Sequence, residues 1–158
     1  MQKITTNLWF DGQAEEAAAF YTSLFEDGRV LGVERFTEAG PGEPGSVVTV
    51  TFRLAGQEFV AINGGPEFTF TEAISLSVDC ETQEEVDRYW EALTADGGEE
   101  VQCGWLKDKY GLSWQIVPRA LAELLASSDR EAAARATRAM LQMKKLDIQA
   151  LRDAAAGV

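Results

Sequence analysis

The sequence predicts an α+β protein made of two halves with the same order of elements, followed by a helical tail. Each half opens with a β-rich segment, continues with a segment of helical periodicity and returns in further β-rich segments. After Pro118 the sequence becomes rich in Ala, Arg, Met and Leu, a composition that favours helices. The two halves share this order without visible sequence repetition, so we expect the repeat in the structure only.

The first half contains four predicted strands and one helix. Residues 4–10 are β-rich and end at Asp11-Gly12, a pair typical of turns. In residues 13–25, apolar side chains recur at helical spacing, and Glu15 and Glu16 fall in the first turn, where the helix dipole favours acids. The remaining strands of this half are predicted for residues 29–37, 47–54 and 58–62.

The second half repeats this order. Residues 73–79 alternate between apolar and polar side chains, with Ser75 and Ser77 on one face. A helix is predicted for residues 82–95, where Thr82 and Glu85 have the spacing of a capping box. Two further strands are predicted for residues 100–106 and 112–117.

The tail is predicted to be helical over residues 119–126 and 128–156. From Ser127 onward, basic side chains outnumber acidic ones, whereas the rest of the chain is strongly acidic. A basic amphipathic helix beside an acidic body is expected to dock on its own domain or on a partner subunit.

Composition excludes several kinds of chemistry. The 158 residues include no histidine, so a Ser-His-Asp triad, a Cys-His dyad and a His-liganded zinc are impossible within one chain. The two cysteines are too few for a four-thiolate metal site or a disulfide framework. The formal net charge of −12 disfavours nucleic acid and anionic membrane surfaces as partners.

The sequence also predicts a cytoplasmic protein. Residues 1–6 have neither a basic segment nor a long apolar segment of the kind found in signal peptides. No apolar run approaches 18 residues, so we expect no membrane-spanning helix. With two cysteines only, a reducing compartment is the expected setting.

Five segments carry a resemblance to a known family. Residues 8–21, Leu-Trp-Phe-Asp-Gly-Gln-Ala-Glu-Glu-Ala-Ala-Ala-Phe-Tyr, resemble the opening strand and helix of the vicinal oxygen chelate superfamily, which includes glyoxalase I, bleomycin-resistance proteins and extradiol dioxygenases. Four other segments resemble its PhnB-like branch, often labelled 3-demethylubiquinone-9 3-methyltransferase; they are residues 63–68, 96–108, 110–118 and 140–148.

The resemblance implies a fold of paired βαβββ modules with a C-terminal helical extension. It implies a glyoxalase-like domain over residues 1–126, with modules at about 1–66 and 67–120, and a helical tail over residues 127–158. In the family, each module lays a helix on one face of a curved sheet, and the two sheets cup a pocket. The resemblance also implies a homodimer that binds a small organic molecule.

The family's metal positions are not filled by metal ligands in this chain. Alignment of helix starts and glycine turns puts them near Thr6, within residues 59–63, at Ala73 and at Gln115. A hydroxyl, a methyl group and a neutral amide supply little charge to a divalent ion, so we expect no metal and no cofactor. The alternative is a metal-dependent lyase, isomerase or dioxygenase-type enzyme that uses Glu72 and Glu58 as ligands.

The residues do not support the methyltransferase label. A glycine-rich turn of the nucleotide-binding kind leads into a helix, but Asn63-Gly64-Gly65-Pro66 precedes no predicted helix. Strand alternation is expected to place six side chains on the concave face: Thr6, Leu8, Ser75, Ser77, Ser113 and Gln115. Trp9, Trp90 and Trp114 are expected to face the helices. The candidate pocket residues are Thr6, Leu8, Ala73, Ser75, Ser77, Cys103, Trp105, Ser113 and Gln115. Enzymatic activity stays open, although no acid, base or nucleophile stands out. A purely structural interaction role stays open as well.

Overall fold

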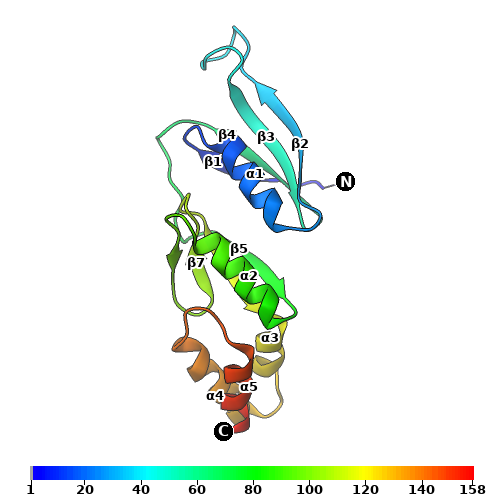
Figure 1. The fold of residues 1–158 in the computed structure, drawn as a ribbon, viewed down its shortest axis with the longest axis vertical. Helices are drawn as coiled ribbons and strands as arrows, with labels where there is room; N and C mark the ends of the chain where they lie inside the picture. Colours follow the sequence, from blue (N-terminus) through cyan, green and yellow to red (C-terminus); the bar gives the residue numbers. More distant parts are fainter. Residues whose placement is uncertain (1) are drawn as a thin grey trace. The chain divides into compact units, whose positions relative to one another are not determined.

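The computed structural model of the chain describes residues 2–158, which form a mixed α+β structure of two compact units (Figure 1). The first unit ends at Thr69 and the second spans Phe70–Val158. Each unit contains one four-stranded sheet with a helix lying across it, and all helices of the tail belong to the second unit. The α+β class and the repeated order predicted from the sequence are therefore confirmed. The boundary of the domain at residue 126 stays a prediction.

The first sheet has the strand order β1-β4-β3-β2, in which β1 runs parallel to β4 and the other neighbours are antiparallel. Its elements are β1 (Thr6–Phe10), α1 (Ala14–Leu24), β2 (Arg29–Arg35), β3 (Val47–Leu54) and β4 (Gln57–Asn63). Helix α1 covers one face with buried alanines and Tyr21, whose ring lies 6.2 Å from that of Phe52 on β3. The small alanines let the helix backbone approach the sheet closely, and the aromatic rings fill the remaining space.

The face that β1 turns to the helix is the reverse of the prediction. Leu8 pairs in register with Ala61, and both side chains are buried in the core with α1. Thr6, two residues before Leu8, shares this face. Trp9 lies on the opposite face, where its Nε1 donates to the carbonyl oxygen of Gly65 at 2.9 Å. Neighbouring apolar residues in β1 make the alternation ambiguous, and the register with β4 decides it.

The second sheet has the order β5-β8-β7-β6, with β5 parallel to β8. Its elements are β5 (Ser75–Cys80), α2 (Gln83–Thr94), β6 (Glu99–Glu100), β7 (Trp105–Lys107) and β8 (Ser113–Pro118). Helix α2 begins as predicted, because the backbone nitrogen of Glu85 donates to the Thr82 hydroxyl at 3.2 Å. Trp90 and Trp114 are buried, as predicted.

The predicted strand over residues 100–106 is wrong. The structure has a hairpin there, in which β6 and β7 pair antiparallel. Cys103 and Gly104 form the turn with φ of +58° and +84°, backbone conformations that break a strand.

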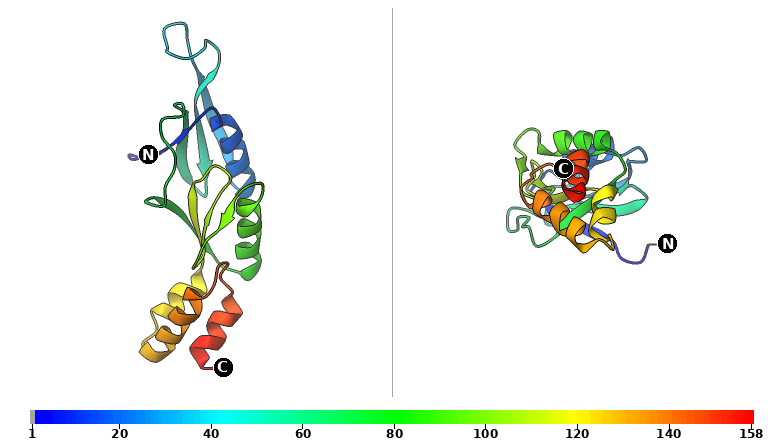
Figure 2. Two further views of the ribbon diagram at one scale, coloured as in Figure 1. Left: turned by 90° about the vertical axis from the view of Figure 1, so that its left-hand side faces the viewer. Right: turned by 90° about the horizontal axis from the view of Figure 1, so that it is seen from below.

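The tail forms three helices instead of two, so the long helix predicted for residues 128–156 is wrong. They are α3 (Arg119–Leu125), α4 (Arg130–Leu141) and α5 (Ile148–Ala156), which gather at one end of the second unit (Figure 2). Leu121, Leu146 and Leu151 form their common core. Asp147 starts α5 by accepting a hydrogen bond from the Ala150 nitrogen at 2.9 Å.

The segment between α4 and α5 is extended because it pairs with the rest of its own unit. The backbone nitrogens of Cys103 and Gly104 donate to the carbonyls of Met143 and Lys144, each at 2.8 Å. The Gln83 side chain, at the start of α2, donates to the Leu146 carbonyl and accepts from the nitrogen of Ile148. The tail therefore docks on its own unit, one of the two placements predicted from its charge.

Candidate functional site

The face of the second sheet opposite α2 gathers most of the predicted pocket residues. Strand register puts Ser75, Ser113 and Lys107 in one row across β5, β8 and β7. It puts Ser77, Gln115 and Trp105 in the adjacent row. These six residues are called the polar face below. The intervening residues of each strand point toward α2 instead, where Leu106, Trp114 and Ile116 are buried.

One hydroxyl of the polar face is buried without a hydrogen-bond partner in the described part of the chain. Ser113 is 1% exposed, and its Oγ has no hydrogen-bond partner among residues 2–158. Its neighbour Gln115 donates from Nε2 to the Ser75 hydroxyl at 2.9 Å, which leaves the Ser75 proton to be donated elsewhere. Leaving a buried hydroxyl unpaired costs free energy, on the order of 1–3 kcal/mol, so the Ser113 position is unfavourable unless a further group is supplied.

Lys107 is the cation of the polar face. Its Nζ lies 2.5 Å from Oε1 of Glu72, which belongs to the turn that precedes β5. The hydrogen bond from Lys107, and then its charge, lower the pKa of Glu72, and the same contacts raise the pKa of Lys107. Glu99 pairs with Lys107 in the β6–β7 ladder and adds a smaller contribution of the same sign to the pKa of the lysine.

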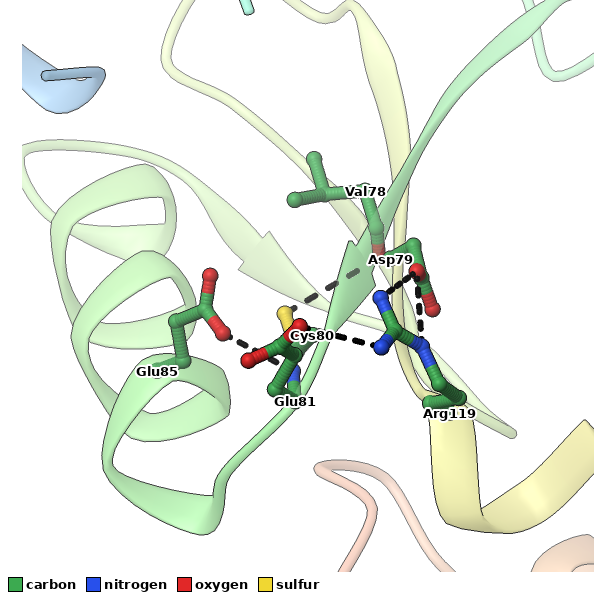
Figure 3. Close-up of polar contacts among 6 residues, drawn as sticks. All are labelled: Val78, Asp79, Cys80, Glu81, Glu85 and Arg119. Carbon is green, nitrogen blue, oxygen red and sulfur yellow. Dashed lines mark hydrogen bonds and ion pairs between the residues drawn. The ribbon is translucent and has the colours of Figure 1, made fainter.

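The C-terminal end of β5 carries an ion-pair cluster on the same side of the sheet as the polar face (Figure 3). Arg119, the first residue of α3, contacts Asp79 at 2.8 Å and Glu81 at 3.0 Å. These hydrogen bonds and charges raise the pKa of Arg119, so the cation is permanent. Cys80 lies between these two acids in sequence and is buried, because strand alternation turns it toward α2. The cluster joins the end of β5 to the start of the tail.

The thiols occupy different environments. Burial of Cys80, and then the nearby charges of Glu85 and Asp79, raise the pKa of its thiol to about 12. Cys103 is half-buried in the turn between β6 and β7, and its backbone is held by Met143. Of the two lysines that follow Cys103 most closely in sequence, Lys107 pairs with Glu72 and Lys109 lies over the Tyr110 ring.

The structure brings together five of the nine predicted pocket residues. They are Ser75, Ser77, Trp105, Ser113 and Gln115. Thr6 and Leu8 belong to the helix-facing side of the first sheet, so their predicted position on the pocket face is wrong. Ala73 is exposed in the turn before β5, which begins two residues later than predicted, and Cys103 lies in the hairpin turn.

Sequence reasoning missed the role of Lys107 in the polar face. Its alternation with Trp105 in a three-residue strand was the available signal. The signal was hidden because residues 100–106 read as one continuous strand, which ended before Lys107.

The residues at the family's metal positions do not fit a metal ion. Ala73 has no donor atom, and the Gln115 amide nitrogen is turned to Ser75, as a hydrogen-bond donor and not a ligand. Among residues 2–158, no group of three His, Cys, Asp or Glu side chains is placed to hold a metal. The two carboxylates considered as substitutes each pair with a cation: Glu72 with Lys107, and Glu58 with Arg53 at 3.4 Å.

The glycines after β4 pack against an aromatic side chain. A Cβ on Gly64 would collide with the Trp9 ring, so only glycine fits there. The next helix, α2, begins only at Gln83, so no helix N-terminus follows this turn to bind a phosphate.

A helix across a four-stranded sheet of order β1-β4-β3-β2, repeated in a second unit, defines the glyoxalase/bleomycin resistance fold. The chain belongs to the family described as 3-demethylubiquinone-9 3-methyltransferase, which it matches over residues 2–117. It is 46% identical to a PhnB protein from Bacillus cereus, with a TM-score of 0.68, over 74% of this chain and 99% of that one.

Two more distant structures share the fold alone. Protein PA1353 from Pseudomonas aeruginosa is 17% identical with a TM-score of 0.62, over 75% of this chain and 98% of that one. The fosfomycin resistance protein FosX from Listeria monocytogenes is 16% identical with a TM-score of 0.54, over 78% of this chain and 97% of that one. No curated protein matches the chain. Within residues 2–158, no helix has the length and apolar character needed to cross a membrane.

Proposed function

We propose that this protein binds a small organic ligand on the polar face of its second sheet, without the metal of the wider superfamily. The buried Ser113 hydroxyl carries the proposal, because it lacks a hydrogen-bond partner in the described chain and stands in a row of polar side chains. Buried polar groups are nearly always paired, so the unpaired hydroxyl, on the side of the sheet opposite α2, supports a ligand group as its missing partner.

The polar face combines the features of a small-molecule site. Trp105 is half-buried and offers an aromatic surface next to Gln115 in the ladder. The Gln115 carbonyl oxygen is an acceptor, and the hydroxyls of Ser75 and Ser113 are donors. A few placed polar groups beside an aromatic surface suit an organic molecule with a planar or apolar body and at least one polar group.

A thermal-shift screen against a metabolite library tests the ligand proposal. Stabilising compounds are then measured against Ser113→Ala, for which we expect about 5- to 100-fold weaker binding, the effect of losing one hydrogen bond. Ser23→Ala is the matched control, since this exposed serine of α1 donates to the Phe20 carbonyl within its own helix. A library without any stabilising compound, or equal losses in the two variants, would contradict the proposal.

The metal-free character has its own test. The residues at the family positions supply one hydroxyl, one methyl group and one neutral amide, and Glu58 and Glu72 are each held by a cation. We therefore expect elemental analysis of the purified protein to find no stoichiometric Ni, Zn, Mn or Fe. One tightly bound metal per chain would favour the metal-dependent lyase, isomerase or dioxygenase alternative.

We further propose that the protein is a cytoplasmic homodimer. Strand β2 is the edge of the first sheet and is exposed at every residue, including Val30, Leu31 and Val33. An exposed apolar edge strand invites pairing with another chain. Both cysteines are free, in keeping with a reducing compartment. Sedimentation should give twice the 17.3 kDa chain mass, and Val33→Lys should lower it toward the monomer; a wild-type monomer at all concentrations would refute the dimer.

A further inference from the structure

The cation of the polar face lies beside its unpaired hydroxyl. Lys107 and Ser113 are direct partners in the β7–β8 ladder, and Ser75 continues the row on the next strand. Side chains of directly paired residues are neighbours on one face of a sheet. One oxyanion bound above this row would therefore meet an ammonium group and two hydroxyl donors.

In the structure, the Lys107 ammonium group pairs with a carboxylate that lies outside the sheet. Glu72 belongs to an exposed turn, and its side chain is 60% exposed, against 33% for Lys107. Exposed ion pairs contribute little net free energy, about 0–1 kcal/mol, so an incoming group displaces Glu72 at small cost. Glu72 also leaves Ser113 unpaired, so a competing oxyanion that reaches both groups makes one more hydrogen bond.

We propose that the ligand of the polar face carries an oxyanion that replaces the Glu72 carboxylate on Lys107, and that Glu72 holds this position in the free protein. The inference rests on the proposed binding function and adds the chemical class of the ligand. Because the ligand's oxyanion replaces the Glu72 carboxylate, the number of negative groups beside Lys107 stays the same. This explains how an acidic protein accepts an anion at this point. Glu99 stands opposite Lys107 on β6, so an anion added without displacing Glu72 would meet two acids.

Two pairs of compounds test the charge of the ligand directly. Acetate and acetamide, and benzoate and benzamide, have nearly the same shape within each pair and differ in charge. Binding is measured at constant ionic strength from NMR shifts of the Trp105 indole and of the backbone amides of Lys107 and Ser113. We expect each anion to bind more tightly than its amide.

Three variants assign the effect to residues. Glu72→Gln should tighten anion binding about two- to fivefold, the value of one exposed ion pair, and leave amide binding unchanged. Lys107→Gln should abolish the preference for anions. Glu123→Gln is the control, because this exposed acid on α3 removes the same charge outside the polar face; it should change nothing.

The outcomes separate the inference from the proposed function. Equal binding of anions and amides at the polar face, or no gain in Glu72→Gln, would overturn the oxyanion inference and leave the ligand site intact. Failure of both anions to bind wild type and Glu72→Gln would also overturn it. The proposed function fails separately, if the metabolite screen yields no ligand of any charge.

Discussion

The indole nitrogen of Trp114 donates a hydrogen bond to Oδ2 of Asp108 at 2.9 Å, and both side chains are buried. The other carboxylate oxygen accepts from the backbone nitrogens of Tyr110 at 2.8 Å and Leu112 at 3.1 Å. One carboxylate thus binds three donors and fixes the turn that joins β7 to β8. Since this turn sets the register of the two strands, Asp108 positions Lys107 opposite Ser113 from behind the polar face.

Replacement of this carboxylate should be costly. Asp108→Asn keeps the shape of the side chain but removes its charge. In either orientation of the amide, its NH₂ group faces an N–H donor, either the Trp114 indole or the backbone nitrogens of Tyr110 and Leu112. We expect a loss of about 2–3 kcal/mol in the free energy of unfolding, measured by urea denaturation. Asp11→Asn, at an exposed acid, should stay within about 0.5 kcal/mol of wild type. Equal effects of the two substitutions would show that Asp108 does not hold the turn.

The docking of the tail can be tested with two glycines that have the same backbone angle. Gly12 and Gly104 both have φ of +84°, but a Cβ on Gly12 meets nothing within 4 Å. A Cβ on Gly104 would lie 2.8 Å from Cδ1 of Leu146 and 3.1 Å from the carbonyl oxygen of Ile116. Gly12→Ala measures the cost of the angle alone, about 1 kcal/mol.

Gly104→Ala should cost about 1–3 kcal/mol more than Gly12→Ala, the usual price of overpacking a core. Hydrogen exchange should also speed up in α5, whose approach depends on Leu146. Identical losses in the two variants, with unchanged exchange in α5, would contradict the docking of the tail against the hairpin turn.

The environment of Cys80 predicts a dependence of stability on alkaline pH. Its pKa is raised to about 12 in the folded chain, so the folded state holds the thiol proton more tightly than the unfolded state does. The resulting stabilisation is complete below the ordinary thiol pKa and is lost as pH rises toward 12. Cys80→Ala should therefore flatten the fall in unfolding free energy above about pH 9. A fall as steep as that of wild type would exclude Cys80 as its source.

Local patterns in the sequence predicted the order of elements because each helix and strand carries its own periodicity. The start of α2 shows this, since the Glu85 nitrogen donates to the Thr82 hydroxyl as expected from their spacing. The Glu85 carboxylate accepts from the nitrogen of Glu81, one residue before the N-cap. In the second sheet, alternation put Ser75, Ser113 and Gln115 on one face, as the strand register also has them, because polar and apolar residues alternate cleanly there.

The errors arose where distant contacts decide the structure. The break between α4 and α5 contains no Gly or Pro; its carbonyls instead bind Cys103 and Gly104, which are about forty residues away in the sequence. Asp147, an N-cap residue before an apolar run, was the local signal that a new helix, α5, begins there. The pairing of Glu72 with Lys107 depends on a turn and a strand that local periodicity cannot bring together.

The polar face as a ligand site is tested most directly by mapping a bound compound. Backbone amide shifts of the full chain are recorded by NMR with the strongest compound from the thermal-shift screen. We predict that the largest changes fall on Ser75, Trp105, Ser113 and Gln115 and are lost in Ser113→Ala. The largest changes in the first unit or in the tail, with binding unaffected by Ser113→Ala, would contradict the account.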